Sequence, residues 1–218
     1  VVKAALIGFP TIEDAGNCVA EIIAQGCIPA GMEIMDKALT KATNDYSKAG
    51  YPTDAEGMMI VEFDGTEHEV NAYIEKVKNI AEKNNSSSLK ISKSNDERLK
   101  FWAGRKAAFP ACGVLAPDYM CMDGSIPRGK LAEVLNEITR LSKKYNLPVA
   151  NAFHAGDGNL HPLIMFDAND PEELKKCEEF GADILKYCVK VGGALTGEHG
   201  VGIEKRELMC EAFNDKDI

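Results

Sequence analysis

The sequence predicts an α+β fold in which ferredoxin-like β-α-β units build an antiparallel sheet with helices packed on one face. Two observations support this prediction. Segments typical of strands and of amphipathic helices follow one another in the order strand, helix, strand, and this order recurs along the chain. The chain has 218 residues, of which 45% are hydrophobic and 27% charged, and this suits one large globular domain or two small ones.

The N-terminal half opens with an apolar segment that ends at Pro10 and is typical of a strand. Thr11 follows as a suitable N-cap, and Gly26 ends the helix. Asp96 is the expected cap of a later helix, and Pro110 is expected to end it. Strands are expected at 1–9, 29–36, 57–64 and 89–91, helices at 11–26, 69–83 and 96–108, and a helix with a loop or partial disorder at 37–56.

The C-terminal half repeats the pattern in a looser form. Pro171 at the first helical position opens its longest helix. The segment 204–213 reads as a final helix. The expected strands are 119–123, 149–153 and 163–167, and the expected helices are 130–145, 171–191 and 204–213.

Charge and composition exclude several classes of protein. Lys and Arg number 25 against 34 Asp and Glu, a net charge of −9, so broad binding to nucleic acid or to an anionic membrane surface is not expected. No apolar run approaches the length of a membrane-spanning helix. The seven Cys form no CxxC pair, which predicts free and mostly buried thiols.

Three of the four His lie in two glycine-rich segments. His154 and His161 flank the sequence Ala-Gly-Asp-Gly-Asn-Leu, which favours a strand, a tight turn and a strand that bring both imidazoles together. Glu198 and His199 lie in the second segment, Gly-Glu-His-Gly-Val-Gly. Two His and one Glu form a recurring catalytic metal set, and His199 would remain free to act as a general base.

Each of these residues also has a simpler interpretation. His154 and His161 could be hydrogen-bonded turn residues, and Glu198 with His199 could be an ordinary surface pair. Arg105 offers a planar fork that matches a carboxylate, yet it could be a plain surface cation. His68 lies among polar residues and is expected to be a solvated surface residue. Neither GxxxxGK[ST] nor GxGxxG is present, so a dinucleotide fingerprint is not expected.

Four segments together resemble one family. They are Phe-Trp-Ala-Gly-Arg-Lys at 101–106, Pro-Asp-Tyr-Met-Cys-Met-Asp-Gly at 117–124, the run at 154–162 and Gly-Gly-Ala-Leu-Thr-Gly-Glu-His-Gly-Val-Gly-Ile-Glu-Lys at 192–205. They resemble the C-terminal domain of FAD-linked oxidases of the vanillyl-alcohol-oxidase type. Within that family the likeness is nearest to the FAD-linked subunits of glycolate oxidases, with D-lactate dehydrogenases nearby.

The resemblance implies a role for each candidate residue. His154, His161 and Glu198 would be ligands of a divalent metal such as zinc, iron or manganese. His199 would be the base that takes the proton of the substrate hydroxyl, and Arg105 would hold the substrate carboxylate. Asn159 would support the metal loop and approach the flavin.

The resemblance also implies a reaction and its substrate class. The reaction would be oxidation of a 2-hydroxy acid with hydride transfer to FAD, in which the protein supplies position and charge. Phe109 and Cys121 occupy positions that carry polar groups in relatives acting on dicarboxylic acids. Neither can hold a second carboxylate, so a small monocarboxylate such as glycolate or D-lactate is expected.

The whole chain, 1–218, is then expected to be the substrate or cap domain. It begins at Val1 without Met, so we expect an excised piece whose N-terminal FAD-binding domain is absent and which is inactive as an oxidase alone. The expected partners are that FAD-binding domain and further subunits including an iron–sulfur protein. A cytoplasmic location is expected, with peripheral attachment to a membrane through those subunits.

Two other functions remain open on the residues themselves. The set of two imidazoles and one carboxylate also fits a metal-dependent hydrolase complete in this chain. A ferredoxin-like binding module with a structural His cluster is the other alternative.

Overall fold

The computed structural model describes residues 1–214, 216 and 217. The strands are β1 Val2–Phe9, β2 Gly31–Asp36, β3 Gly57–Asp64, β4 Ser88–Ile91, β5 Asp118–Cys121, β6 Gly124–Ser125, β7 Val149–His154 and β8 Asn159–Phe166. The helices are α1 Ile12–Ala24, α2 Lys37–Ser47, α3 Glu67–Lys83, α4 Asn95–Lys106, α5 Ala108–Cys112, α6 Leu131–Tyr145, α7 Pro171–Lys190 and α8 Met209–Ala212.

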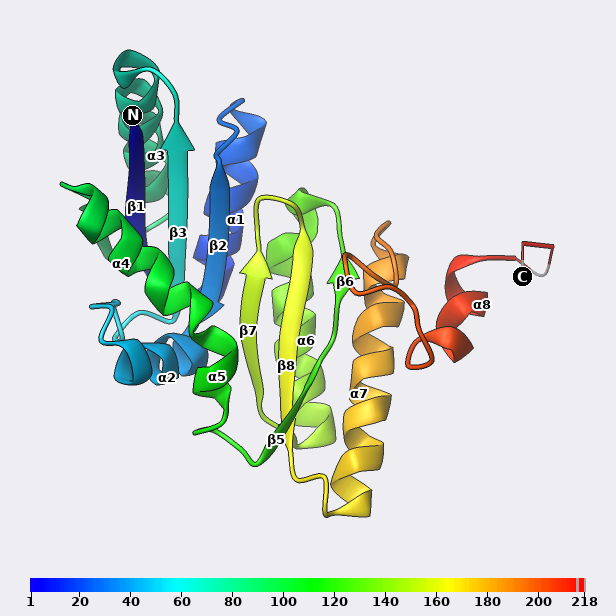
Figure 1. Ribbon diagram of the computed structural model, residues 1–218. Helices are drawn as coiled ribbons and strands as arrows, with labels where there is room; N and C mark the ends of the chain where they lie inside the picture. The colour runs from blue at the N-terminus through cyan, green and yellow to red at the C-terminus, as the bar shows by residue number, and fades with distance from the viewer. Residues whose placement is uncertain (215, 218) are drawn as a thin grey trace.

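The described strands form one eight-stranded sheet in the order β4-β1-β3-β2-β7-β8-β5, with β6 also paired to β8 (Figure 1). Every pairing is antiparallel. The predicted α+β class with an antiparallel sheet is therefore confirmed.

The sheet consists of two ferredoxin-like units side by side. In the first, β1-α1-β2 and β3-α3-β4 place their strands in the order β4-β1-β3-β2. In the second, β6-α6-β7 is followed by β8, α7 and a single bridge between Ser125 and Ala194. The units join where β2 pairs with β7 through Ile34–Phe153 and Met35–Ala152.

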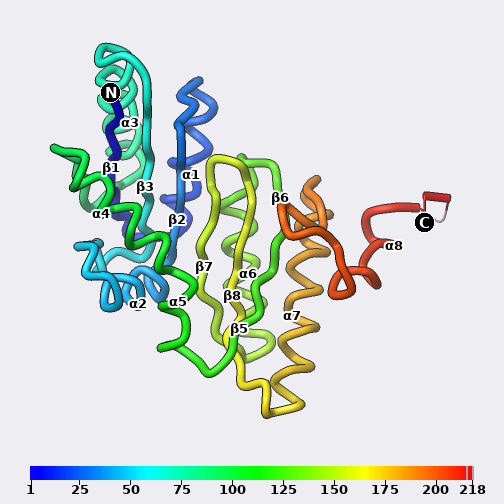
Figure 2. Tube along the Cα trace, in the orientation of Figure 1, coloured from blue at the N-terminus to red at the C-terminus, as the bar shows by residue number. Residues whose placement is uncertain are grey.

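Two apolar cores lie on opposite faces of the sheet because successive strand residues point to opposite sides. The long helices α1, α3, α6 and α7 pack on one face, as predicted (Figure 1). The prediction of helices on one face alone misses α2, α4 and α5, which cover part of the other face. The Cα trace shows α4 and α5 crossing in front of the first unit (Figure 2).

Several expected boundaries shift. Ser94, not Asp96, caps α4 through its hydroxyl. Pro110 does not end a helix: α4 stops at Lys106, and Pro110 lies in the first turn of α5, where a missing N–H costs no helical bond. The final helix expected at 204–213 shortens to a 3₁₀ turn and α8, and the strand expected at 163–167 starts four residues earlier as β8.

Other expectations from composition are confirmed. All seven Cys are free, and five of them are buried. His68 is exposed on the first turn of α3. Within the described part of the chain, no helix has the length and hydropathy needed to span a bilayer.

Candidate functional site

The hairpin of β7 and β8 brings His154 and His161 together. His154 ends β7 and pairs with Asn159, while His161 pairs with Ala152, two residues earlier on β7. Gly158 closes the turn with φ 75°, a conformation that favours glycine, and a Cβ there would collide with the carbonyl of Ile126. The two rings meet edge to face with their centroids 5.0 Å apart.

The loop after α7 adds the second pair of residues. Glu198 Oε1 lies 3.1 Å from His161 Nε2 and 3.7 Å from His154 Nε2. The His199 ring stacks on the His161 ring at 5.2 Å, and its Nε2 lies 3.9 Å from Glu198 Oε1. The two glycine-rich segments, more than 30 residues apart in sequence, therefore form one cluster on the sheet face that also carries α4 and α5.

A second carboxylate, Glu33 on β2, supports this cluster from beneath. Its Oε1 lies 2.7 Å from His154 Nδ1, and its Oε2 accepts a hydrogen bond from Arg105 Nε at 3.1 Å. Because a carboxylate only accepts, Nδ1 of His154 carries the hydrogen in this contact, and Nε2 is the ring atom that faces Glu198. Glu33 thus sets the ring orientation of one candidate ligand.

The surroundings of His154 and His161 shift their pKa values in opposite directions. The hydrogen bond that His154 donates to Glu33 raises the pKa of His154 above its ordinary value, although partial burial opposes this. Burial lowers the pKa of His161, and the neighbouring charge of His154 lowers it further. The lowered pKa of His161 favours its neutral form, the form in which an imidazole binds a metal.

The donor atoms fit a divalent cation. One ligand atom each from His154, His161 and Glu198 lies within 4.8 Å of the others. Two imidazoles and one carboxylate leave coordination positions open for substrate or water. The Glu33–His154 contact is the outer hydrogen bond that metal-ligating His residues usually make. A second set, Asp123, His161 and His199, meets the same distance criterion.

The structure places Arg105 close to this cluster but already paired. It is only 7% exposed, and its Nη2 lies 3.0 Å from Glu33 Oε2, at an angle that makes no hydrogen bond. Nη2 therefore keeps its donor capacity. The planar fork is fixed by Glu33, so Arg105 is held in one orientation.

Phe109, Cys121 and Asn159 surround His161 and the loop. The Phe109 ring lies 6.2 Å from the His161 ring, and Cys121 Sγ lies 3.8 Å from His161 Nδ1. Asn159 lies directly under Gly197, where a Cβ would collide with Asn159 Oδ1. That oxygen is buried and has no hydrogen-bond partner among the described residues.

Sequence reasoning assigned no role to Glu33, Asp123 or Lys205. Each is buried and charged, with at most 9% of its surface exposed. Glu33 and Asp123 both lie in segments whose neighbours are apolar, and an acidic residue in such a segment was the available signal. The partners of Glu33 and Asp123 could not be identified from the sequence, because their contacts join strands and loops that lie far apart in the chain.

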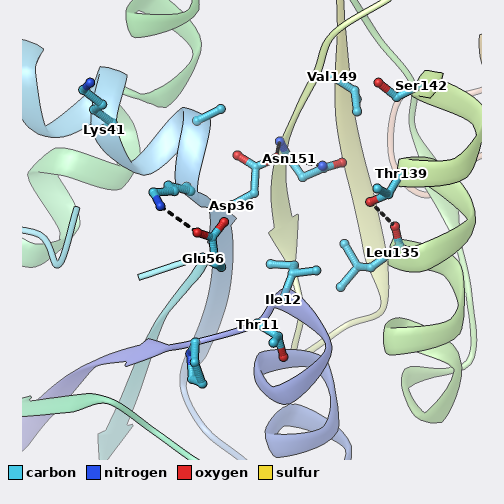
Figure 3. Close-up of a pocket in the computed structure, with 13 residues that line it drawn as sticks. Thr11, Ile12, Asp36, Lys41, Glu56, Leu135, Thr139, Ser142, Val149 and Asn151 are labelled. Atoms are coloured by element: carbon cyan, nitrogen blue, oxygen red, sulfur yellow. Dashed lines mark hydrogen bonds and ion pairs between the residues drawn. The ribbon is translucent and has the colours of Figure 1, made fainter. Parts of the chain in front are cut away.

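A separate cavity of about 670 Å³ lies between α2 and α6 (Figure 3). Asp36, Lys41, Leu135, Thr139 and Asn151 are among its lining residues. None of the predicted site residues lines it, so this cavity is distinct from the His cluster.

The fold is a pair of ferredoxin-like units, and its sheet carries a cluster of three imidazoles and two carboxylates. The whole chain, residues 1–218, matches the family described as FAD linked oxidases, C-terminal domain. The chain belongs to this family, and the resemblance drawn from its motifs is confirmed.

Two relatives and one solved structure illustrate the family. The chain is 50% identical over 218 residues to the glycolate oxidase subunit GlcD of Escherichia coli, covering 100% of this chain and 44% of that protein. It is 30% identical over 228 residues to D-lactate dehydrogenase [cytochrome] 1, mitochondrial, of Saccharomyces cerevisiae, covering 98% and 38%. The 4-ethylphenol oxidase of Gulosibacter chungangensis matches with TM-score 0.66 at 10% identity, covering 97% and 50%, and shows the shared fold. The chain thus spans less than half the length of these two relatives.

Proposed function

We propose that this chain is the substrate-side domain of a flavin-dependent 2-hydroxy-acid oxidase or dehydrogenase. Its substrate is a small monocarboxylate, glycolate or D-lactate, which is oxidised to the 2-oxo acid. The observation that carries the proposal is the convergence of Glu198 and His199 on His154 and His161 in a chain of the FAD-linked oxidase family. The names of the two relatives supply the substrate class.

Substrate binding is assigned to a cation and to Arg105. His154 Nε2, His161 Nε2 and Glu198 Oε1 are the proposed ligands of a divalent metal such as zinc, iron or manganese. When bound, this metal polarises the substrate hydroxyl and neutralises negative charge. Arg105 Nη2, which makes no hydrogen bond within the described part of the chain, is the proposed donor to the substrate carboxylate.

Proton removal is assigned to His199. Its ring stacks on His161 while its side chain stays 46% exposed, so its imidazole can reach a substrate bound at the cluster. His199 takes the hydroxyl proton as the C–H bond of the α-carbon breaks. FAD, when bound, accepts the hydride, so two electrons and one proton leave the acid for the flavin and a second proton goes to His199.

The size of the substrate follows from Phe109 and Cys121. Both lie against His161, and neither carries a charge that could pair with a second carboxylate. An aromatic ring and a thiol beside the cluster suit a short substrate side chain. The monocarboxylates glycolate and D-lactate meet this requirement.

The remaining parts of the protein are also proposals. FAD is held mainly by a separate N-terminal domain, with Asn159 approaching the flavin, and the isolated chain is inactive as an oxidase. Further subunits, including an iron–sulfur protein, carry the electrons onward in a cytoplasmic assembly attached peripherally to a membrane. Family membership favours this function over a complete metal-dependent hydrolase or a non-catalytic binding module.

The test is substrate profiling of the full-length flavoprotein. Flavin reduction is followed with glycolate, D-lactate and a dicarboxylic 2-hydroxy acid, before and after treatment with a chelator. The proposal expects fast reduction by the monocarboxylates and a loss on chelation that added metal restores. Absence of flavin reduction by any 2-hydroxy acid would refute the function, and full activity without metal would refute the ligand assignment.

A further inference from the structure

One buried carboxylate organises the exposed loop that carries Glu198 and His199. Asp123 lies between β5 and β6 and is fully buried. Its Oδ2 accepts hydrogen bonds from Thr196 Oγ1 at 2.7 Å and from the backbone N–H groups of Gly197, Glu198 and His199 at 3.0, 3.1 and 2.9 Å. Four donors from consecutive residues therefore surround one side chain.

Lys205 completes the surroundings of Asp123 from the far end of the same loop. Its Nζ lies 2.8 Å from the backbone oxygen of Asp123 and 3.3 Å from Oδ2, and the residue is only 2% exposed. Burial alone would raise the pKa of Asp123, but the hydrogen bonds from Thr196, His199 and Glu198 and the charge of Lys205 lower it far below its usual range.

The coordination of Asp123 within the protein distinguishes it from a metal ligand. Its Oδ2 already receives five contacts from loop donors, and its Oδ1 accepts from the Glu198 N–H at 3.1 Å. A metal at Asp123 would have to displace these donors. The second set of possible ligands, which contains Asp123, is for this reason the weaker candidate.

We propose that Asp123 is a positioning residue that folds residues 196–199 round its carboxylate and so holds Glu198 and His199 in register with His161. This deepens the proposed function and rests on it for the roles of Glu198 and His199. The physical reason is preorganisation: an exposed, glycine-rich loop would otherwise sample many conformations, and each would move both side chains. Thr196 assists, because its hydroxyl also accepts the Gly200 N–H at 2.8 Å.

Hydrogen–deuterium exchange of the full-length protein tests the positioning without any assumption about metal or activity. In the wild type, the amides of residues 197–199 should exchange slowly although these residues are exposed. Asp123→Asn should speed their exchange roughly 10-fold or more, because hydrogen bonds to a charged acceptor are lost. Asp183→Asn is the matched control: it removes a carboxylate that binds Lys144 and Tyr145, away from the loop.

A second pair of variants covers the case in which Asp123→Asn fails to fold. Thr196→Val removes one donor to Asp123, so it should speed loop exchange by a smaller factor, and Thr196→Ser should restore the slow exchange. The proposal is overturned if the loop amides of Asp123→Asn exchange as slowly as those of the wild type. If only Thr196→Val folds, wild-type exchange rates in that variant overturn it.

Metal affinity separates this inference from the proposed function. Titration of Mn²⁺ into full-length protein, followed by electron paramagnetic resonance, should show binding weakened by roughly 10- to 100-fold in Asp123→Asn, with kcat falling more than KM rises. Wild-type Mn²⁺ affinity in Asp123→Asn would overturn the positioning role. Wild-type protein that binds no Mn²⁺ would count against the proposed metal site, and the exchange data would still decide the role of Asp123.

Discussion

Glu33 Oε1 lies 2.7 Å from His154 Nδ1, and this contact couples the first ferredoxin-like unit to the second at the His cluster. The same carboxylate accepts from Arg105, so one side chain orients both a proposed metal ligand and the proposed carboxylate donor. β2 and β7 pair one residue away, between Ile34 and Phe153, which fixes the two side chains across the seam.

Replacing Glu33 by Gln should therefore weaken the metal site. Gln keeps the volume but removes the charge that holds the His154 Nδ1–H and the buried Arg105 guanidinium. We expect metal affinity to fall roughly 10- to 100-fold, measured by Mn²⁺ titration of the full-length protein. The unfolding midpoint should also drop, because Arg105 is left buried without a counterion.

Glu62→Gln supplies a matched control for that experiment. Glu62 is also a strand glutamate paired with an arginine of α4, accepting from Arg98 and from Trp102. Its loss should lower stability and leave metal affinity unchanged. If Glu33→Gln binds the metal as tightly as Glu62→Gln and the wild type do, Glu33 contributes to stability alone.

His199→Ala should separate chemistry from binding. The ring is 46% exposed, so its removal should cost little stability. If His199 is the base, flavin reduction by glycolate or D-lactate should slow by roughly 10²- to 10⁴-fold while FAD content and Mn²⁺ affinity stay near those of the wild type. Stopped-flow flavin absorbance measures the rate, and near-normal reduction would exclude this residue as the base.

The sequence predicts the fold well where local patterns decide it. The helix at α3 follows from its apolar spacing, although the Thr66–Glu69 capping box starts it at Glu67, two residues before the expected start, and the strand β3 has the predicted bounds. The hairpin of His154 and His161 follows from turn-forming residues between two strands. Predictions fail where tertiary contacts decide, as at residues 204–213, where the chain wraps round Asp123 through Lys205 and leaves only four residues for α8.

The same division applies to the candidate site. The motifs identified His154, His161, Glu198 and His199 because glycines, imidazoles and a carboxylate are locally unusual. Glu33 and Asp123 were missed because each acts across the sheet or into a distant loop. Partners separated by 121 and by 73 to 82 residues leave no local signal in a single sequence.

Stability should depend on pH through Asp36, which lies at the cavity between α2 and α6 (Figure 3). Burial raises the pKa of Asp36 to about 6, although hydrogen bonds from Leu39 and Asn151 oppose this. The folded state therefore binds the proton more tightly than the unfolded state, whose carboxyl has a pKa of about 4. Stability should fall by about 3 kcal/mol as pH rises from about 4 to about 6, and then level off.

Asp36→Asn should remove that slope. Asn is also a good N-cap for α2 and can accept from the Leu39 N–H, so the helix should keep its start. Urea unfolding of both proteins at pH 4.5, 5.5 and 6.5 makes the comparison. A wild-type slope that persists unchanged in the Asn variant would assign the pH dependence to other groups.

Phe109 should limit the size of the substrate side chain, because its ring edge faces His161 and is itself packed against Tyr119. Phe109→Ala opens space beside the cluster without adding charge. The larger side chain of 2-hydroxyhexanoate should then fit. The kcat/KM for 2-hydroxyhexanoate, divided by the kcat/KM for glycolate, should therefore rise by roughly 10- to 200-fold. Phe109→Ala should still accept a dicarboxylic 2-hydroxy acid poorly, since the substitution introduces no cation.

The control is Phe213→Ala. Phe213 is an exposed aromatic residue at the C-terminal side of α8, and its replacement should leave the ratio unchanged. A ratio that stays constant in Phe109→Ala would place the substrate side chain away from this ring and would move the specificity determinant to another wall of the site.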